Sequence, residues 1–248
     1  MEKKTNIPFF SFDKLSDKIK KYKKKSIFFD YVLDDVCNAT LDIYSSLINK
    51  GFLNKIYISY NDDNLGNYFI NEYIKTFYSK NNIIYLDVSN FRNIDELLGY
   101  NEKNNLLDNI KLYPFSVFVV SNYENCDLSI KEFLEKINKS GYYLDKYNKK
   151  IDFSNCLFIY TLLNKKNIGF NDSANSNNMI NINGICFDKF KKNIKRLYSK
   201  TKFNDEMILN IYNLILSNYD NLNNIDYLIR KECLSNNKSN KKQRTMKV

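Results

Sequence analysis

Hydrophobic residues follow two different periods along this chain. Between residues 33 and 50 they recur at helical spacing on one face, and Gly51 follows as a stop signal. Short apolar runs typical of buried strands occur at residues 55–59, 82–88, 116–120 and 156–161. Helical patterns separate these runs at 68–78, 105–112 and 128–138. Because nearly continuous apolar strands that alternate with helices need crossover connections, the sequence predicts an α/β fold with a parallel sheet covered on both faces.

The composition changes after Thr161. An Asn/Ser-rich stretch runs to Asn183, and three helical patterns follow at 187–199, 204–217 and 222–234. We therefore expect four parts, which are a basic N-terminal arm (1–26), a large α/β subdomain (27–183), a small helical subdomain (184–234) and a basic disordered tail (235–248).

The residue types that are missing exclude several kinds of enzyme. The chain has 248 residues, of which 44% are hydrophobic, so it can fill a core, but it contains no His. It therefore lacks the usual general base, the usual nitrogen ligand of zinc and every Ser-His or Cys-His pair. The five Cys are odd in number and widely spaced, without a C-x-x-C pair, which disfavours disulfides and a metal site. We expect reduced, mostly buried thiols and no bound metal.

The net charge of +10 is concentrated near the two ends of the sequence. Residues 1–26 carry +6 and residues 230–248 carry another +6, so the rest carries −2. Nucleic-acid recognition commonly uses cations spread over a folded face with aromatic side chains between them, so nucleic acid is not an expected partner. The basic run over 18–25 is typical of a solvated arm. No apolar run suits a signal peptide or a membrane span, so no membrane contact is expected.

Several strings of the chain resemble the second AAA+ module of the Clp unfoldases, above all the ClpC branch of plastids and bacteria. Leu98-Gly99-Tyr100 and, further on, Tyr113-Pro114-Phe115-Ser116-Val117 are similar to the family's L-x-G-Y…R-P-Y-S-V string before the third strand. Asp145 and Ile151-Asp152-Phe153-Ser154-Asn155 resemble its D…V-D-F-x-N segment. The resemblance covers about residues 30–234. It implies an AAA+ P-loop-type parallel sheet flanked by helices and followed by a small helical subdomain.

The resemblance also places a phosphate-binding loop after the first strand. A P-loop cradles phosphates with Gly-rich backbone, a Lys and a Ser/Thr hydroxyl. Residues 60–67 read as a polar loop of the right length, with Gly66 in place of the Lys and Asn67 in place of Ser/Thr. The carboxylates of Asp62 and Asp63 would repel a triphosphate. The vestigial nucleotide-binding loop therefore comprises Asn61, Asp62, Asp63, Asn64, Leu65, Gly66 and Asn67.

Other groups on which the family's chemistry depends are also missing. Ser121 and Asn122 occupy the Walker B position, where Asp-Glu would hold magnesium and orient water. Leu163 replaces the sensor-1 Asn, and Asp226 replaces the sensor-2 Arg. The stretch that would supply an arginine finger contains no Arg, and the aromatic pore loop is deleted. We expect no catalytic residues, and we expect that ancestral binding of ATP and magnesium has been lost.

A second candidate site lies in the Asn/Ser-rich stretch. Ile168-Gly169-Phe170 falls where ClpC-like proteins carry the tripeptide that docks into the ClpP peptidase. Two apolar anchors around a glycine suit insertion into pockets. The alternative is a loop that packs into the protein's own core. The resemblance thus implies a ClpP-type peptidase, other Clp ATPase subunits and protein substrates as partners.

The leading interpretation is a degenerate ClpC-like regulatory subunit of a chaperone–protease assembly that cannot hydrolyse ATP. A divergent but active ATP-dependent unfoldase and a non-enzymatic binding module that uses the basic tails are the alternatives. Asn occupies 40 positions, a bias that AT-rich coding explains. Together with the plastid resemblance it predicts the stroma of a plastid such as an apicoplast, or else the cytoplasm of an AT-rich bacterium.

Overall fold

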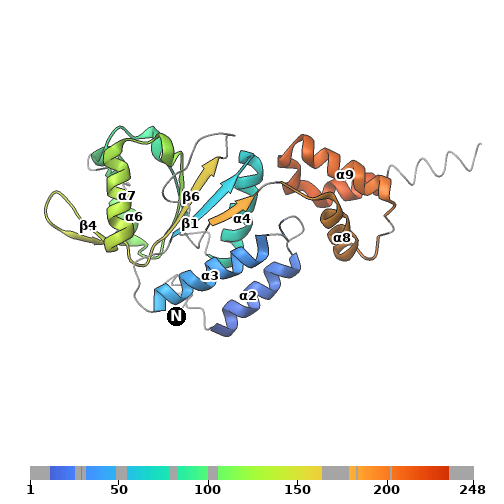
Figure 1. Cartoon of the computed structure of the whole chain (residues 1–248), viewed down its shortest axis with the longest axis horizontal. Coiled ribbons are helices and arrows are strands. Elements are labelled where there is room, and N and C mark those ends of the chain that lie inside the picture. Colours follow the sequence, from blue (N-terminus) through green and yellow to red (C-terminus); the bar gives the residue numbers. More distant parts are fainter. Residues whose placement is uncertain are drawn as a thin grey trace, which may run out of the picture.

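A five-stranded parallel sheet forms the centre of the protein (Figure 1). The computed structural model describes residues 12–25, 29, 32–48, 55–78, 83–99, 106–163, 179–182, 184–201 and 203–234. In spatial order the strands are β2 (Ile83–Asp87), β3 (Val117–Ser121), β6 (Leu157–Leu163), β1 (Lys55–Tyr60) and β7 (Met179–Ile182). All pairings are parallel, so the carboxyl ends of the strands lie at one edge of the sheet. The predicted α/β class is confirmed.

Helices cover both faces of the sheet. One face packs against α2 (Phe12–Lys25), α3 (Leu33–Ile48) and α4 (Asp63–Phe77). The other face packs against α5 (Ile94–Leu98), α6 (Leu106–Leu112) and α7 (Leu128–Ser140). Short 3-10 turns, η3 (Val88–Asn90) and η4 (Tyr123–Asn125), follow β2 and β3.

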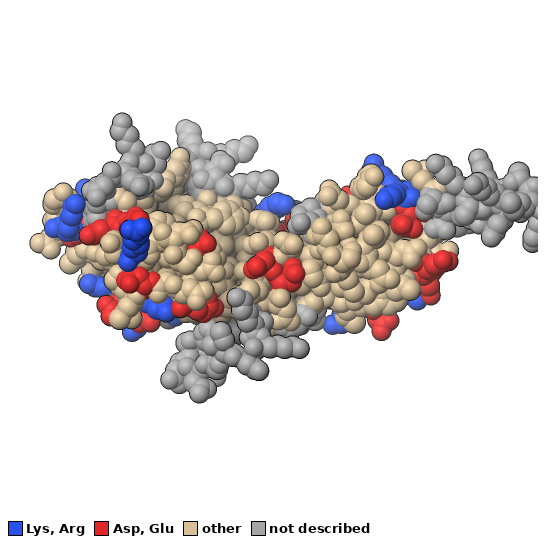
Figure 2. Space-filling model, turned by 90° about the horizontal axis from the view of Figure 1, so that it is seen from above, with Lys and Arg blue, Asp and Glu red and all other residues tan. Residues whose placement is uncertain are grey.

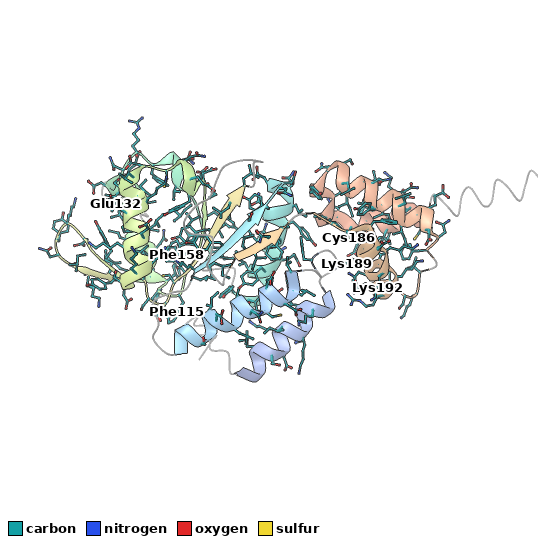
Figure 3. The ribbon with its side chains drawn as sticks, viewed as in Figure 1. Phe115, Glu132, Phe158, Cys186, Lys189 and Lys192 are labelled. Atoms are coloured by element: carbon teal, nitrogen blue, oxygen red, sulfur yellow. The ribbon has the colours of Figure 1, made fainter. Side chains whose placement is uncertain are left out.

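Alternation along the strands divides the core between these two faces. In β3, Val117 and Val119 belong to the cluster on the α4 side, whereas Phe118 and Val120 belong to the cluster on the α7 side. Phe158 of β6, labelled in Figure 3, stacks on Phe118 with ring centroids 5.0 Å apart. Side chains that alternate in this way explain why strands buried on both faces read as continuous apolar runs.

Two short elements in the sheet region were not predicted. β7 lies within the stretch predicted to be an Asn/Ser-rich connection, and its Ile180 and Ile182 are buried. A β-hairpin follows α7 and consists of β4 (Tyr142–Leu144) and β5 (Lys150–Asp152). Both were missed because three or four residues are too few to establish a period.

The prediction of a solvated basic arm is wrong for residues 12–25. These residues form α2, which is amphipathic, and its Leu15 and Tyr22 are 2% and 4% exposed within the main core. Tyr22 lies against Phe77 of α4, with ring centroids 5.5 Å apart. Lys20, Lys21 and Lys23 stay exposed. The apolar positions of α2 recur every three to four residues, as in an amphipathic helix, but the lysines between them conceal this pattern in the sequence.

The small helical part continues the same core. It contains α8 (Phe187–Leu197), α9 (Asp205–Ser217), the 3-10 turn η5 (Tyr219–Asn224) and a last helix over 225–234. η5 contacts both α9 and α4. Apolar residues of α4 and of α9, Phe69 and Ile211 among them, belong to one continuous cluster. α4 therefore joins the sheet to the small helical part.

The thiol prediction holds for most of the cysteines. Cys37, Cys126 and Cys156 are buried, Cys233 is half-buried, and all five are free. Burial raises the pKa of Cys156 to about 12. Cys186 is the exception because it is exposed. Within the described residues, none of the helices is both long and apolar enough for a membrane span.

Replacing Leu15 by Ala should lower the free energy of unfolding by about 2–5 kcal/mol, because the cavity would open inside the main core. Lys21→Ala on the exposed side of α2 is the matched control and should change stability by no more than about 0.5 kcal/mol. Urea unfolding of the full chain measures both effects. Equal, small effects of the two changes would show that α2 is not packed on the core.

Candidate functional site

The candidate site lies where β1 ends and α4 begins, at the carboxyl edge of the sheet. Ligands of open α/β sheets bind outside this edge, and phosphates bind at the start of the following helix. β1 ends at Tyr60 and α4 begins at Asp63, so only Asn61 and Asp62 connect them. The prediction that residues 60–67 form a loop is therefore wrong, because 63–67 are the first residues of the helix.

The first turn of α4 is capped by the chain itself. Asp62 is the N-cap residue, and its Oδ1 accepts a hydrogen bond of 3.0 Å from the backbone N–H of Leu65. The backbone N–H of Gly66 donates to the Asp62 carbonyl at 2.9 Å. The start of a helix offers free N–H groups and a positive dipole end, which attract anions. Here the carboxylate of Asp62 already occupies the anion-binding position at the start of α4.

The ring of Tyr60 lies directly against Gly66. Tyr60 is 5% exposed, and a β-carbon added to Gly66 would stand 2.5 Å from Cγ and 2.6 Å from Cε1 of this ring. Such distances are shorter than carbon atoms tolerate, so the ring can lie here only because residue 66 has no side chain. Leu65, 1% exposed, packs into the same cluster as Tyr60. The β1–α4 junction is thus closed by an aromatic side chain.

The surroundings of the Tyr60 hydroxyl are acidic. Burial raises the pKa of Tyr60, and a hydrogen bond with Thr161 of β6 offsets part of this rise. The carboxylates of Asp63 and Glu124 raise the pKa further. Glu124 belongs to η4, and its own backbone carbonyl accepts a hydrogen bond of 2.9 Å from Lys131 Nζ. The charges that act on this hydroxyl are therefore negative.

The two residues at the Walker B position turn toward the edge of the sheet. Ser121 ends β3, and its hydroxyl donates to the carbonyl of Leu86 in β2 at 3.4 Å. Asn122 has a φ of 57° and precedes η4. Hydrogen bonds from Ser89 and then Asn122 lower the pKa of Asp87, at the end of β2. Ser121 and Asn122 therefore form hydrogen bonds with residues of β2, and neither of them places a carboxylate beside Tyr60.

The two sensor positions also lack groups that could contact a phosphate. Leu163 is the last residue of β6, pairs with Tyr60 and is 36% exposed. Asp226 accepts a short hydrogen bond from the hydroxyl of Tyr198, the residue after α8. Burial raises the pKa of Tyr198, and the bond to Asp226 raises it further. Asp226 therefore stabilises the small helical part itself.

The small helical part reaches the junction through η5. Burial raises the pKa of Tyr219, the first residue of η5, and the Asp62 carboxylate adds to this rise. Because this electrostatic effect needs proximity, the cap of α4 lies close to η5. Elements from both parts of the chain thus meet at α4, where Leu65 and Gly66 are buried and Asn61, Asp63, Asn64 and Asn67 stay exposed.

Other predicted features lie outside the described residues. Ile168, Gly169 and Phe170, the candidate docking residues, are among them, as is Tyr100. No group of three or more Cys, Asp and Glu residues in the described part of the chain is arranged to hold a metal ion.

Comparison with known proteins depends on structure, because sequence gives no match. No protein-family model matches the chain, and no curated protein matches it. Among 216 solved chains that match its structure are two of Hsp104. The Hsp104–ADP complex of S. cerevisiae has a TM-score of 0.59 at 15% identity and covers 80% of this chain. A closed-state Hsp104 complex with ATPγS and FITC-casein has a TM-score of 0.56 at 14% identity and covers 82%.

The chain shares the fold of part of the Hsp104 chains. At these identities the likeness concerns the fold. The chain spans 43% of the length of either Hsp104 chain, so it corresponds to one part of them. The matched parts make up 80% and 82% of this chain, which is more than the five-stranded sheet and its flanking helices. The shared fold agrees with the resemblance that the sequence strings indicated.

Tyr60 is the residue of this site that sequence reasoning missed. It was taken only as the start of a loop, whereas it is the side chain that closes the junction. The available signal was an aromatic residue at the end of an apolar run with a Gly six positions later. That signal becomes meaningful only once the helix is known to begin at Asp63, since Gly66 then lies within its first turn.

Gly66→Ala should destabilise the protein by about 1–3 kcal/mol, because the new methyl group would overlap the Tyr60 ring. In an open helix the same change would stabilise by about 0.5–1 kcal/mol, so the sign distinguishes the two situations. Urea unfolding measures the difference.

The double variant Tyr60→Val/Gly66→Ala provides the control. With the ring removed, adding Gly66→Ala should cost nothing further or be stabilising, which a double-mutant cycle reports as coupling. Additive effects of the two changes would contradict the contact.

Proposed function

We propose that this chain is a Clp-type AAA+ subunit that neither retains nor hydrolyses ATP and acts through contacts with other proteins. The observation that carries the proposal is the filled β1–α4 junction. Tyr60 covers Gly66, and Asp62 takes the N–H of Leu65 at the start of α4. A nucleotide would have to displace both, at the cost of the packing and the cap.

Electrostatics supports the same proposal. A triphosphate needs cations, but Gly66 stands where the family's Lys would be, and no Walker B carboxylate is present to hold a magnesium ion. The carboxylates of Asp62, Asp63 and Glu124 surround the junction instead. Each carboxylate within about 4–6 Å of a phosphate would cost on the order of one to several kcal/mol in a partly buried site.

A fold of this kind can persist after its catalytic and nucleotide-binding residues are lost. The sheet and its helices are held by buried apolar side chains, and the junction adds to that core once an aromatic residue fills it. A non-hydrolysing subunit would serve the assembly as a structural or regulatory part. The alternative of a divergent, active unfoldase would need Tyr60 to leave the junction and Glu124 to take over the work of the absent carboxylates.

Protein partners are the second half of the proposal. One of the structurally similar Hsp104 complexes contains casein, which suggests polypeptides as substrates of an assembly that includes this chain. Seen from above, much of the small helical part is uncharged (Figure 2), and α9 exposes Leu209, Leu214 and Leu216. Exposed apolar residues on one helix are typical of contact surfaces. Other Clp ATPase subunits and a ClpP-type peptidase are the partners that the sequence resemblance suggests, in a plastid or an AT-rich bacterium.

The purified full chain should neither turn over ATP with magnesium nor change its melting temperature when Mg·ATP or Mg·ADP is added, because the junction is closed. Phosphate release and thermal unfolding measure these two properties. Magnesium-dependent turnover that disappears in Asp63→Ala or Gly66→Val would contradict the proposal and favour the active unfoldase.

Phe170→Ala should weaken capture of a ClpP-type peptidase by about 30-fold or more, the loss expected for an apolar anchor worth about 2 kcal/mol. Asn171→Ala, the adjacent change, is the control and should have little effect. A pull-down or surface-binding titration measures both. Equal capture by parent and Phe170→Ala would remove the docking hypothesis and leave the nucleotide proposal standing.

A further inference from the structure

The β4–β5 hairpin carries a basic and aromatic surface that the proposed function does not use. It forms the end of the molecule opposite the small helical part (Figure 1). Tyr143 pairs with Ile151 on its inner face, and Tyr143 packs edge-on against Phe133 of α7 at 4.9 Å. Leu144 pairs with Lys150 on the outer face, which Tyr142 shares by alternation. The inner face anchors the hairpin, and the outer face meets solvent.

Two tyrosine rings on this hairpin each have a lysine over them. Lys150 Nζ lies 4.6 Å from the centroid of the Tyr142 ring, and Lys146 Nζ lies 5.3 Å from that of Tyr147. Tyr142 is 36% exposed and Tyr147 is 76% exposed. Tyr142 and Lys150 are eight positions apart in the sequence and meet only because the strands pair. The fold thus produces the interleaving of cations and aromatic rings that the sequence alone did not reveal.

The acidic residues of the hairpin are occupied by its own backbone. Asp145 is 8% exposed, and its Oδ1 accepts hydrogen bonds from the N–H groups of Tyr147 and Lys149 at 2.9 and 2.8 Å. Asp152 Oδ1 accepts from the N–H of Ser154 at 2.8 Å. The bonds of Asp145 fix the turn, whereas Asp152 is exposed on the outer face, where it pairs with Tyr142.

The end of α7 enlarges the basic surface. Lys136 lies 6.0 Å from the ring of Tyr143, and Lys139 is exposed in the last turn of the helix. Glu132 and Glu135 are exposed one turn before Lys136 and Lys139. Burial raises the pKa of Tyr123, and the Glu135 carboxylate raises it further. Residues 136–152 therefore combine five lysines with two aspartates, of which Asp145 is buried in the turn and Asp152 is exposed in β5.

We propose that this hairpin surface binds single-stranded nucleic acid. The lysines would contact phosphates, and bases would stack on Tyr142 and Tyr147, since every base has a flat face and each ring contact is worth about 1–3 kcal/mol. Residues 136–152 carry a net charge of +3, which favours a polyanion. An acidic polypeptide is disfavoured because exposed ion pairs alone contribute little, and because carboxylate side chains offer no flat base to stack on the two exposed rings. The proposal stands independently of the nucleotide site.

Fluorescence anisotropy of the full chain with a labelled single-stranded oligonucleotide, measured over a range of salt concentrations, tests it. Tyr142→Leu/Tyr147→Leu keeps apolar side chains but removes the rings, and should weaken binding by about tenfold for each ring. Lys146→Gln/Lys150→Gln should weaken binding and lower the salt slope by about 1–2. Unchanged urea midpoints would establish that both variants fold.

A charge-matched pair on the far side is the control. Lys189 and Lys192 project from α8 (Figure 3), and Lys189→Gln/Lys192→Gln removes the same charge. This variant should lose far less affinity than the hairpin lysine pair. Absence of binding, equal losses from the two lysine pairs, or unaltered binding in the tyrosine variant would overturn the proposal. Equally strong competition by polyglutamate that depends on the same tyrosines would overturn it in favour of an acidic polypeptide.

Discussion

The contact between the Tyr60 ring and Gly66 determines how the central strand passes into its helix. Because residue 66 has no side chain, the ring can cover the first turn of α4, and the helix can begin only two residues after β1. Asp62 then caps that turn with its own carboxylate. The three features depend on one another, since a longer loop would separate the ring from Gly66 and leave the helix start without its cap.

The same junction connects the two parts of the chain. α4 carries Leu65 and Phe69 into the main core, and the core extends without interruption to Ile211 and Leu222 in the small helical part. Tyr219 lies close enough to Asp62 to have its pKa raised by that carboxylate. Protein side chains therefore make the connection between the parts at this edge of the sheet. Such a connection is consistent with a subunit whose arrangement needs no nucleotide.

The sequence predicted the sheet well because its central strands are buried on both faces and read as apolar runs. It failed where the signal was short, as in β7, or hidden beneath lysines, as in α2. Residues 63–67 were predicted as part of a loop but begin α4, since polar residues at a helix start look like a loop. Tyr60 and the Tyr142–Lys150 pair were missed because one contact depends on where α4 begins and the other on the pairing of β4 with β5, neither of which the hydrophobic pattern reveals.

A crystal or cryo-EM structure of the full chain, determined with a non-hydrolysable ATP analogue and magnesium in excess, tests the central claim most directly. The account predicts that the Tyr60 ring stays against Gly66, that Asp62 still accepts from the N–H of Leu65, and that no nucleotide occupies this edge of the sheet. Density for phosphates at the start of α4, with the Tyr60 ring displaced, would contradict it.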